Sequence, residues 1–401
     1  MRQLFACLAL LIAAHSAVRA DDAPKRLNVF LLAGQSNMVG HAQYHTIPAL
    51  LTAEEPGVKQ LAKLIFKEGA IAPGDTRDML EIRVKRDALD GDLRAKKIPG
   101  GDKIAAAQAE LKDLQAKVDA KAKKIKDAFA VSKRVYISSI ADGHKPSGPL
   151  TMGYGASPDK IGPELGFGLS LEQKLDGPIL LIKTSWGGKS LHYDFRPPSA
   201  GPYELSKAQA DGKDAQKIKD NAGLNYRMMN EAVRDVLKDL KKHHPDYDAT
   251  SGYEIAGFVW FQGFNDQFDP AFHGNYKTNM IAFVKDVRNK YKVPNMPFVI
   301  GVLGTGATKE EVDKNAVSLG QRAAAAVPEF KDNVAIVESY PFYALDALAM
   351  WKDGTWSKKP IEFSQIGSDR PYHYMGSGKF FVRLGDALAT VMVDLKKKQK
   401  Q

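Results

Sequence analysis

The strongest constraint on the fold is the stretch 27–38, LNVFLLAGQSNM, in which an apolar run stops at Gly34 and is followed by Ser36. A run of this length and composition, ending at a small residue, is typical of a buried strand that leads into a tight turn. Ser36 is then expected at the carboxyl end of a central strand, just before a helix, which is where α/β proteins gather their chemistry. The alternative is that Ser36 and Asn37 only cap that helix.

Strand-like and helix-like segments alternate along most of the remaining chain. Strands are expected at 178–185, 253–261, 297–303 and 333–338, and helices at 163–175, 226–242, 272–291, 309–326 and 377–396. Such alternation implies right-handed crossovers and a parallel sheet with helices on both faces. The predicted fold class is therefore α/β, with a doubly wound sheet.

The segment 102–130 interrupts this alternation because it is rich in Ala and Lys. Apolar residues recur there at near-heptad spacing, and Lys121 interrupts the seam; they are Leu111, Leu114, Val118, Ile125 and Ala128. We expect a projecting amphipathic helix that pairs with 77–95 or with another subunit, or else a solvated helix packed by one stripe. The region at about 76–132 is too narrow for its own core, so we treat it as a helical insertion in a single domain, 21–401.

The first twenty residues have the features of a secretory signal peptide. Arg2 precedes an apolar core at 4–14, and small residues stand at Val18 and Ala20. The core is too short to cross a bilayer. Cleavage after Ala20 would remove Cys7, the single cysteine, so neither disulfides nor thiol catalysis is expected. The prediction is a secreted or periplasmic protein that is not held in a membrane after cleavage.

The formal net charge is +10, of which Arg2 and Arg19 contribute two charges within the signal segment. Such an excess suits an acidic glycan or a negatively charged envelope, or it is simply a solvated Lys-rich face that aids solubility. No nucleic-acid motif accompanies the charge, so no nucleic-acid partner is expected. The histidines in the motifs lack partners at metal-ligand spacing, so we expect neither a metal nor another cofactor.

Polar turns follow several predicted strands and carry the groups that a serine esterase needs. Hydrolysis by a serine requires the hydroxyl, a base and N–H donors for the developing oxyanion. SWGGKSL offers Gly187 and Gly188, and WFQGFND offers Gln262, Asn265 and Asp266. Diglycine turns are common, however, and amides often only stabilise loops. It is the recurrence of such turns at successive strand ends that favours a hydrolase site.

A late turn, SDRPYHYMGSGK, supplies His373 just before the last helix and Asp369 four residues earlier. His373 is a candidate general base, although a single histidine is more often structural. Trp186, Trp260 and Phe264 flank the motifs and could stack on a sugar ring, although aromatic residues at strand ends usually belong to the core.

Together, GQSNM, GPELGFG at 162–168, KTSWGGKSL, WFQGFND and the late histidine resemble the sialate O-acetylesterase-like (SASA) branch of the SGNH hydrolases, the group that contains carbohydrate esterase family six. The resemblance runs discontinuously from about residue 27 to the last helix and skips the Lys-rich insertion. It implies a flavodoxin-like three-layer α/β/α fold and metal-independent removal of O-acetyl groups from oligosaccharides or polysaccharides.

The resemblance also implies roles for individual residues. Ser36 is the nucleophile, and its N–H acts with Gly187 or Gly188 as oxyanion donor. His373 is the base. Either Gln262 or Asn265 is the third donor, and Gln35 joins the substrate-binding set.

Two positions depart from the family pattern. Phe264 stands where an acidic residue is common, and Arg370 occupies the usual place of the acid, three residues before His373. Asp369 is one position further back and can reach His373 only through a wider turn. The fallback acids are Glu338, Asp346 and Asp353.

These departures leave a second function open, a catalytically weak glycan-binding or scaffold protein on the same fold. A third, a lipid or aryl esterase, would be expected to carry a lid-like apolar segment, which we do not find. The acetylated glycan and the oligomeric state are not determined by the sequence.

Overall fold

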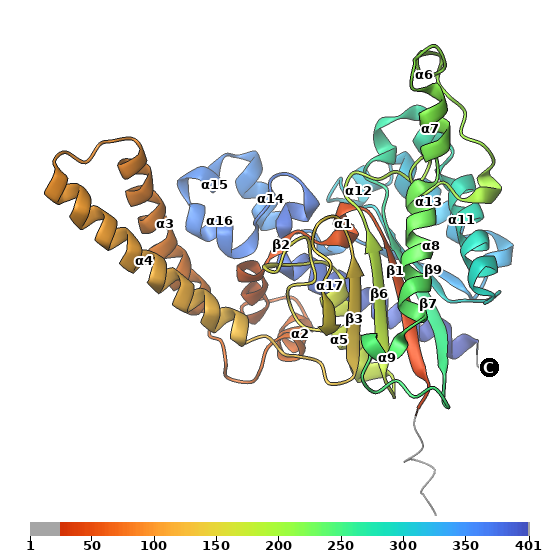
Figure 1. The fold of residues 1–401 in the computed structure, drawn as a ribbon, viewed down its shortest axis with the longest axis horizontal. Coiled ribbons are helices and arrows are strands. Elements are labelled where there is room, and N and C mark those ends of the chain that lie inside the picture. The colour runs from red at the N-terminus through yellow and green to blue at the C-terminus, as the bar shows by residue number, and fades with distance from the viewer. Residues whose placement is uncertain (1–24, 400–401) are drawn as a thin grey trace, which may run out of the picture.

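The computed structural model describes residues 25–399, in which one seven-stranded sheet lies between layers of helices (Figure 1). The spatial order of the strands is β4-β3-β6-β1-β7-β8-β9, and all pairs are parallel except β3 with β4. The strands are β1 (Leu27–Gly34), β3 (Val135–Ile140), β4 (Ser147–Pro149), β6 (Ile179–Ser185), β7 (Tyr253–Phe261), β8 (Phe298–Val302) and β9 (Val334–Glu338).

The sheet has the flavodoxin-like topology that the resemblance implied. Taken in chain order, β6-β1-β7-β8-β9 follow the pattern 2-1-3-4-5, and β3 and β4 extend the sheet beyond β6. The chain leaves β1 for one side of the sheet and returns to the other side at β7. The carboxyl ends of β1 and β7 therefore form a topological switch point, where ligands bind in folds of this kind.

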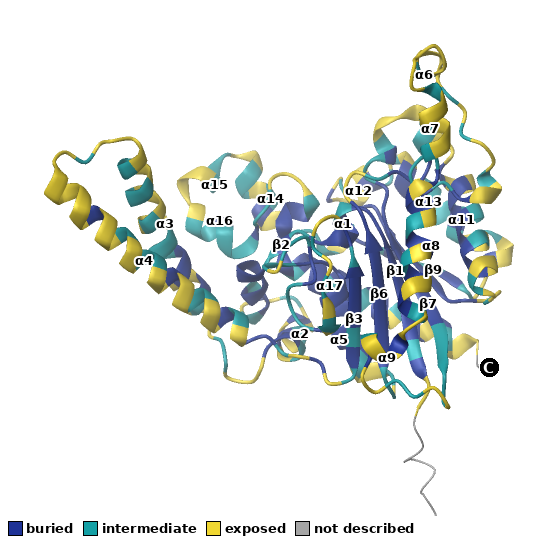
Figure 2. Cartoon of the chain, viewed as in Figure 1, coloured by how far each residue is buried: buried dark blue, intermediate teal, exposed yellow. Residues whose placement is uncertain are grey.

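Alternate residues of β1 enter two separate cores, one on each face of the sheet, and the strands β1, β6 and β8 are almost entirely buried (Figure 2). Phe30 and Leu32 face one core, and Val29 and Leu31 face the other. The first core is covered mainly by α5 (Glu164–Lys174) and α17 (Gly378–Lys398), and the second by α8 (Leu224–Leu237), α11 (Tyr276–Tyr291) and α13 (Ala316–Ala325).

A helical hairpin, here called the arm, projects from one side of the sheet (Figure 1). It consists of α3 (Gly74–Arg94) and α4 (Gly101–Asp127), which pack against each other. Lys124 pairs with Asp75 at 2.6 Å across the hairpin, and Lys121 pairs with Asp78 at 2.9 Å. The hairpin alternative for this segment is thus confirmed, and the residue that interrupts the apolar seam, Lys121, joins the two helices.

Three of the predicted helices are divided. The segment 226–242 becomes α8 and α9 (Leu240–His243), 272–291 becomes α10 (Pro270–Gly274) and α11, and 309–326 becomes α12 (Lys309–Val312) and α13. In the last case the Asn315 side chain accepts hydrogen bonds from the N–H groups of Val317 and Ser318, which starts a new helix.

Shorter elements complete the fold. They are α1 (Ser36–Val39), β2 (Ala42–Gln43), η1 (Tyr44–Leu51), α2 (Val58–Ile65), β5 (Lys160–Ile161), η2 (Pro198–Ala200), α6 (Lys207–Ala210), α7 (Ala215–Asn221), η3 (Asp266–Phe268), α10 (Pro270–Gly274), η4 (Pro328–Phe330), η5 (Tyr340–Phe342), α14 (Leu345–Lys352), α15 (Thr355–Lys358), α16 (Pro360–Ile366) and η6 (His373–Gly376). The sequence analysis did not anticipate β3, β4 or α14 to α16.

Within residues 25–399, no helix combines the length and apolarity that crossing a bilayer requires. The predicted signal peptide at 1–20 and Cys7 lie outside the described residues.

Candidate active site

The predicted site residues meet at one edge of the sheet because three neighbouring strands end there. Gly34 of β1 is paired with Ser185 of β6 and with Phe261 of β7. A Cβ at Gly34 would lie 2.1 Å from the Phe261 carbonyl oxygen, so only glycine allows the strands to approach this closely. Ser36 follows as the first residue of α1 and is partly exposed. Its N–H and Oγ make no hydrogen bond within the described chain.

Gln35 is fully buried and connects the Ser36 turn to the loop after β7. Its Nε2 donates to Asn265 Oδ1 at 2.9 Å. Its Oε1 accepts from Gln262 Nε2 at 3.2 Å and from the backbone N–H groups of Gly263 and Asn265 at 3.1 and 3.3 Å. Because Oδ1 of Asn265 is occupied, its Nδ2 is the amide atom left without a hydrogen bond in residues 25–399.

Gln262 is also buried, and internal contacts use its whole amide. Its Nε2 donates to the Lys189 carbonyl at 2.9 Å and to Asp266 Oδ2, and its Oε1 accepts from Tyr276 Oη–H at 2.8 Å. Asp266 in turn accepts from the backbone N–H of Leu191 at 2.9 Å. Gln262 therefore fixes the loops after β6 and β7 relative to each other.

The two candidate glycines after β6 differ in their hydrogen bonding. The Gly187 N–H donates to Asp142 Oδ2 at 3.0 Å, whereas the Gly188 N–H has no partner in the described chain. Gly188 has φ +68°, a left-handed conformation that glycine adopts without strain. Both glycines are exposed, and Gly188 is the one whose N–H is free to bind a ligand.

His373 and Asp369 are in direct contact, with 2.7 Å between Nδ1 and Oδ2. Burial acts to raise the pKa of Asp369, but the hydrogen bond and the charge of His373 outweigh it and hold the pKa below its usual value. The wider turn that the sequence required is therefore present. No hydrogen bond joins His373 to Ser36 among the described contacts.

The backbone that presents His373 is strained. His373, Tyr374 and Met375 have φ values of 51°, 53° and 63°, a left-handed run that non-glycine residues rarely adopt. Buried Tyr374 stabilises the run because its ring stacks on Phe380 at 3.9 Å and its Oη accepts the Gly304 N–H at 3.1 Å. Packing around Tyr374 thus determines the position of the neighbouring histidine.

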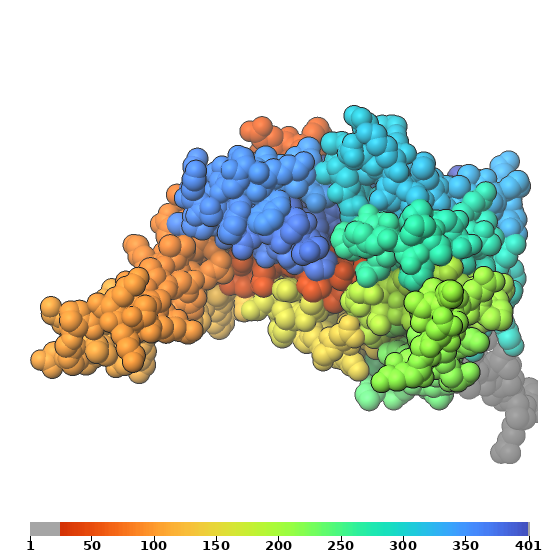
Figure 3. Space-filling view, turned by 90° about the horizontal axis from the view of Figure 1, so that it is seen from above, coloured from red at the N-terminus to blue at the C-terminus, as the bar shows by residue number. Residues whose placement is uncertain are grey.

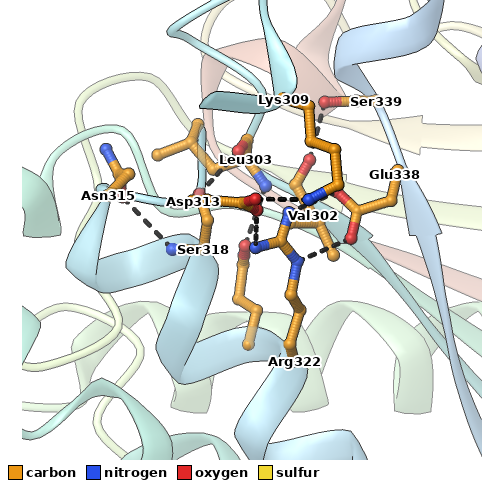
Figure 4. Close-up of polar contacts among 10 residues, drawn as sticks. Val302, Leu303, Lys309, Asp313, Asn315, Ser318, Arg322, Glu338 and Ser339 are labelled. Carbon is orange, nitrogen blue, oxygen red and sulfur yellow. Dashed lines mark hydrogen bonds and ion pairs between the residues drawn. The ribbon is translucent and has the colours of Figure 1, made fainter. Parts of the chain in front are cut away.

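The fallback acids have other partners. Glu338 forms a two-pronged ion pair with Arg322, at 2.7 and 3.0 Å, and Arg322 also binds Asp313 at 2.8 Å (Figure 4). Asp346 accepts the N–H of Ala347 at 2.9 Å, and Asp353 that of Thr355 at 2.8 Å. None of the three is bonded to His373 in the described chain, and the cluster of Figure 4 instead ties α13 to β9.

His41 is a site residue that the sequence analysis missed. Its ring stacks on His373 with 4.0 Å between centroids and 12° between planes. Burial lowers the pKa of His41 to about 3, and the charges of His373 and Lys160 add to the effect. His41 is therefore neutral at ordinary pH. Its position could not be inferred from spacing because more than 300 residues separate it from His373.

His41, Asp369 and His373 also place ligand-type atoms within 4.8 Å of one another. The expectation that the motif histidines lack such partners is therefore incomplete. The planes of the two rings are only 12° apart, so their in-plane lone pairs lie in two separate, nearly parallel planes, whereas the donor atoms of a metal site converge on one ion. The stacking of the two rings therefore does not favour metal binding.

Beneath the Ser36 turn lies a fully buried ion pair between Lys183 and Glu164, at 2.9 Å. Lys183 Nζ also donates to the carbonyls of Val39, at 2.9 Å, and Tyr154, at 2.6 Å. Lys183 thus fixes the end of the short helix that begins at Ser36.

Of the three aromatic residues considered for sugar stacking, two belong to the core. Trp260 is 0% exposed and Trp186 4%. Phe264 is partly exposed and touches Phe268 and Tyr372, with distances of 5.2 and 6.3 Å between ring centroids. Phe268 and Tyr372 are themselves exposed. Phe264 is thus the candidate that remains.

Three solved structures resemble the chain at 13% sequence identity each. A protein from Arabidopsis thaliana has a TM-score of 0.44, with 92% of this chain and 98% of that chain covered. A carbohydrate acetylesterase from Xanthomonas citri has 0.36, with 78% and 49% covered, so the match spans about half of that protein. The structure of NanS has a TM-score of 0.38, with 79% of this chain and 78% of NanS covered. No curated protein sequence matches the chain.

A family profile does match, over residues 144–342. The family is SASA, described as "Carbohydrate esterase, sialic acid-specific acetylesterase". The matched part contains Gly188, Gln262 and Asn265, whereas Ser36 and His373 lie outside it. By this match, residues 144–342, just under half of the chain, are a segment of the carbohydrate esterase family of sialic acid-specific acetylesterases.

Proposed function

We propose that the protein is an exported serine esterase that removes O-acetyl groups from carbohydrates through Ser36, His373 and Asp369. The observation that carries the proposal is the 2.7 Å contact between His373 Nδ1 and Asp369 Oδ2, on a turn beside the sheet edge that bears Ser36. Export rests on the sequence pattern of residues 1–20 alone. Residues 21–401 are proposed to form one esterase domain, with the arm as an insertion.

In the first step, His373 takes the proton of Ser36. The Nδ1–H of His373 donates to Asp369, which leaves Nε2 unprotonated and able to accept the hydroxyl proton. Ser36 Oγ attacks the acetyl carbonyl carbon and forms a tetrahedral intermediate. His373 then gives the proton to the departing sugar hydroxyl, and the acetyl group stays on Ser36. Water repeats these steps and releases acetate.

Three groups are free to stabilise the oxyanion: the Ser36 N–H, the Gly188 N–H and Asn265 Nδ2. Each is without a hydrogen bond in the described chain, whereas the N–H of Gly187 and the amide of Gln262 are engaged. We therefore favour Gly188 and Asn265 as donors. Gln35 and Gln262 position these donors and are too buried to contact a sugar.

The experiment that tests the function is acetate release by wild type and Ser36→Ala. Acetylated xylan, pectin, sialosides and peptidoglycan, together with an aryl acetate, would serve as substrates. We expect wild type to release acetate from at least one glycan and Ser36→Ala to release none while keeping its melting temperature. Ser357→Ala, an exposed serine in α15, is the matched control and should retain activity. Undiminished activity of Ser36→Ala would refute the assignment.

A second candidate is a glycan-binding protein that does not turn over substrate. The observation that favours it is the lack of a described hydrogen bond between Ser36 and His373, although such bonds are often long in unliganded enzymes and form when substrate binds. A serine-directed phosphonate separates the two candidates. Labelling of Ser36 supports the esterase, and glycan binding without labelling supports the binding protein.

A further inference from the structure

A polar pocket of about 570 Å³ lies beside the catalytic turn, where the arm meets the helices that follow β9. Ser368 and Arg370, the residues on either side of Asp369, line it. Arg83 of α3, His45 of η1 and Trp356 of α15 form other parts of its wall. In the view of Figure 3 the arm abuts the segment that carries α14 to α16, and Arg77 of α3 pairs with Glu362 of α16 at 3.7 Å.

Two arginines of this pocket lack the partners that arginines elsewhere in the fold have. Among residues 25–399, only Arg26, Arg83 and Arg370 have a guanidinium group without a hydrogen bond or ion pair to another described residue. Arg26 lies apart, on a different surface depression. The other two line the same pocket.

Arg83 is partly buried, so leaving it unpaired is unfavourable. Burial lowers the pKa of Arg83, because the charged form is disfavoured where water is partly excluded. The acidic groups near it have other ion-pair partners: Asp87 binds Arg86, and Asp159, which also lines the pocket, binds Lys126 at 2.5 Å. A partly buried guanidinium without a hydrogen bond or ion pair to another described residue is a favourable partner for an anion brought by a ligand.

The rest of the pocket sets one carboxylate, that of Asp159, which is paired with Lys126, against the two arginines. The guanidinium of Arg370, an exposed residue, lies 3.5 Å from the centre of the Trp356 ring, a cation–π contact that uses none of its N–H groups for hydrogen bonding. Neighbouring His45 is buried, and burial lowers its pKa to about 3, so it is neutral. Its Nδ1–H donates to the Ser364 carbonyl at 2.8 Å.

We propose that this pocket is a subsite for an anionic group, a carboxylate or a sulfate, on the glycan that Ser36 deacetylates. This inference rests on the proposed function and adds the substrate class to it. Arg83 and Arg370 bind the anion, and the arm is thereby part of the substrate site. Neither arginine lies in the segment 144–342 that matches the family profile, so the subsite lies outside the matched segment.

The test compares kcat/KM on charged and neutral acetyl esters within each variant, so that a general loss of activity cancels. The substrates are an acetylated oligogalacturonide, an acetylated sulfated galactan fragment, an acetylated xylo-oligosaccharide and an aryl acetate. We expect wild type to prefer one of the two anionic glycans to the neutral one. Arg83→Gln and Arg370→Gln should each reduce this preference about tenfold, because each loses a charge-assisted hydrogen bond. Arg26→Gln, which removes an unpaired arginine elsewhere, should keep the preference of wild type.

Each outcome has a defined meaning. If wild type prefers only the carboxylate glycan or only the sulfated glycan, and both Arg83→Gln and Arg370→Gln lose this preference, the preferred glycan identifies which anion the subsite binds. Equal wild-type rates on neutral and anionic glycans, or an unchanged preference in the Arg83→Gln/Arg370→Gln double variant, would overturn the subsite. If no glycan is deacetylated, calorimetric titration with the deacetylated anionic oligosaccharides decides separately. Binding that the double variant loses keeps the subsite while the proposed esterase function fails.

Discussion

Replacing Gln35 by glutamate should inactivate the proposed esterase without touching the reacting atoms. In the native chain Gln35 Nε2 donates to Asn265 Oδ1 at 2.9 Å, which leaves Asn265 Nδ2 free for the proposed oxyanion. Glutamate keeps the oxygen that accepts from Gly263, Asn265 and Gln262, and these N–H groups favour its ionised form. Its second oxygen cannot donate, so the Asn265 amide should rotate by half a turn and direct Oδ1 at the oxyanion.

The expected effect is the loss of one oxyanion donor. Such a loss lowers kcat by about 10²-fold to 10³-fold, or roughly 3 to 4 kcal/mol of transition-state stabilisation. Asn265→Ala removes the same donor directly and should lower kcat by a similar factor. KM should change little in either variant, because the oxyanion exists only in the transition state.

The decisive measurement is the double variant, assayed with an aryl acetate. If Gln35 acts only by orienting Asn265, then Gln35→Glu/Asn265→Ala should be no slower than Asn265→Ala, within a few-fold. Thermal unfolding of each variant controls for misfolding. Multiplied losses of about 10⁴-fold or more, or normal activity in Gln35→Glu, would refute the orienting role.

Three further variants test other parts of the structure. Asp369→Asn should lower kcat by roughly 10³-fold to 10⁴-fold with a normal melting temperature, because the His373 tautomer is no longer fixed; an unchanged kcat would disprove the role of this acid. His45→Asn should make the free energy of unfolding less sensitive to acid. Burial lowers the pKa of His45 from 6.5 to about 3. Between these two pH values the unfolded chain binds a proton at this histidine that the folded chain does not, so the free energy of unfolding falls as the pH drops. In urea unfolding, the free energy of unfolding that is lost between pH 7 and pH 4 should be smaller in His45→Asn than in wild type by about 3 kcal/mol. An equal loss in wild type and His45→Asn would contradict the lowered pKa of His45. Gly34→Ala should prevent folding or abolish activity, since its Cβ would lie 2.1 Å from the Phe261 oxygen, and a soluble, active variant would be inconsistent with that packing.

Local patterns in the sequence predicted the sheet and the turns that bear the site. The strand β7 has the predicted bounds 253–261, and Ser36 follows the central strand as expected. These predictions succeed because a strand buried on both faces must be apolar throughout and its end must be marked by small or polar residues. The strand β3, by contrast, has the sequence VYISSI, whose paired serines weaken the apolar signal.

Relations between distant segments could not be predicted from local patterns. The stacking of His41 on His373, and the choice between Gln262 and Asn265, depend on how loops far apart in the chain are folded together. The sequence offered two amides of equal chemistry. Burial and the orientation imposed by Gln35 distinguish them, and both are properties of the tertiary structure.

The buried pair of Lys183 and Glu164 has a consequence for how this protein can evolve. Loss of one partner would strand a charge in the core, at a cost of about 3 to 5 kcal/mol, which is a large part of a typical domain's stability. Changing both partners to apolar residues would not restore the balance, because the carbonyls of Val39 and Tyr154 would then lose their donor. Every single-step path away from the pair therefore passes through a weakened protein. We expect mutational drift to spare these two positions even in descendants that have lost the serine.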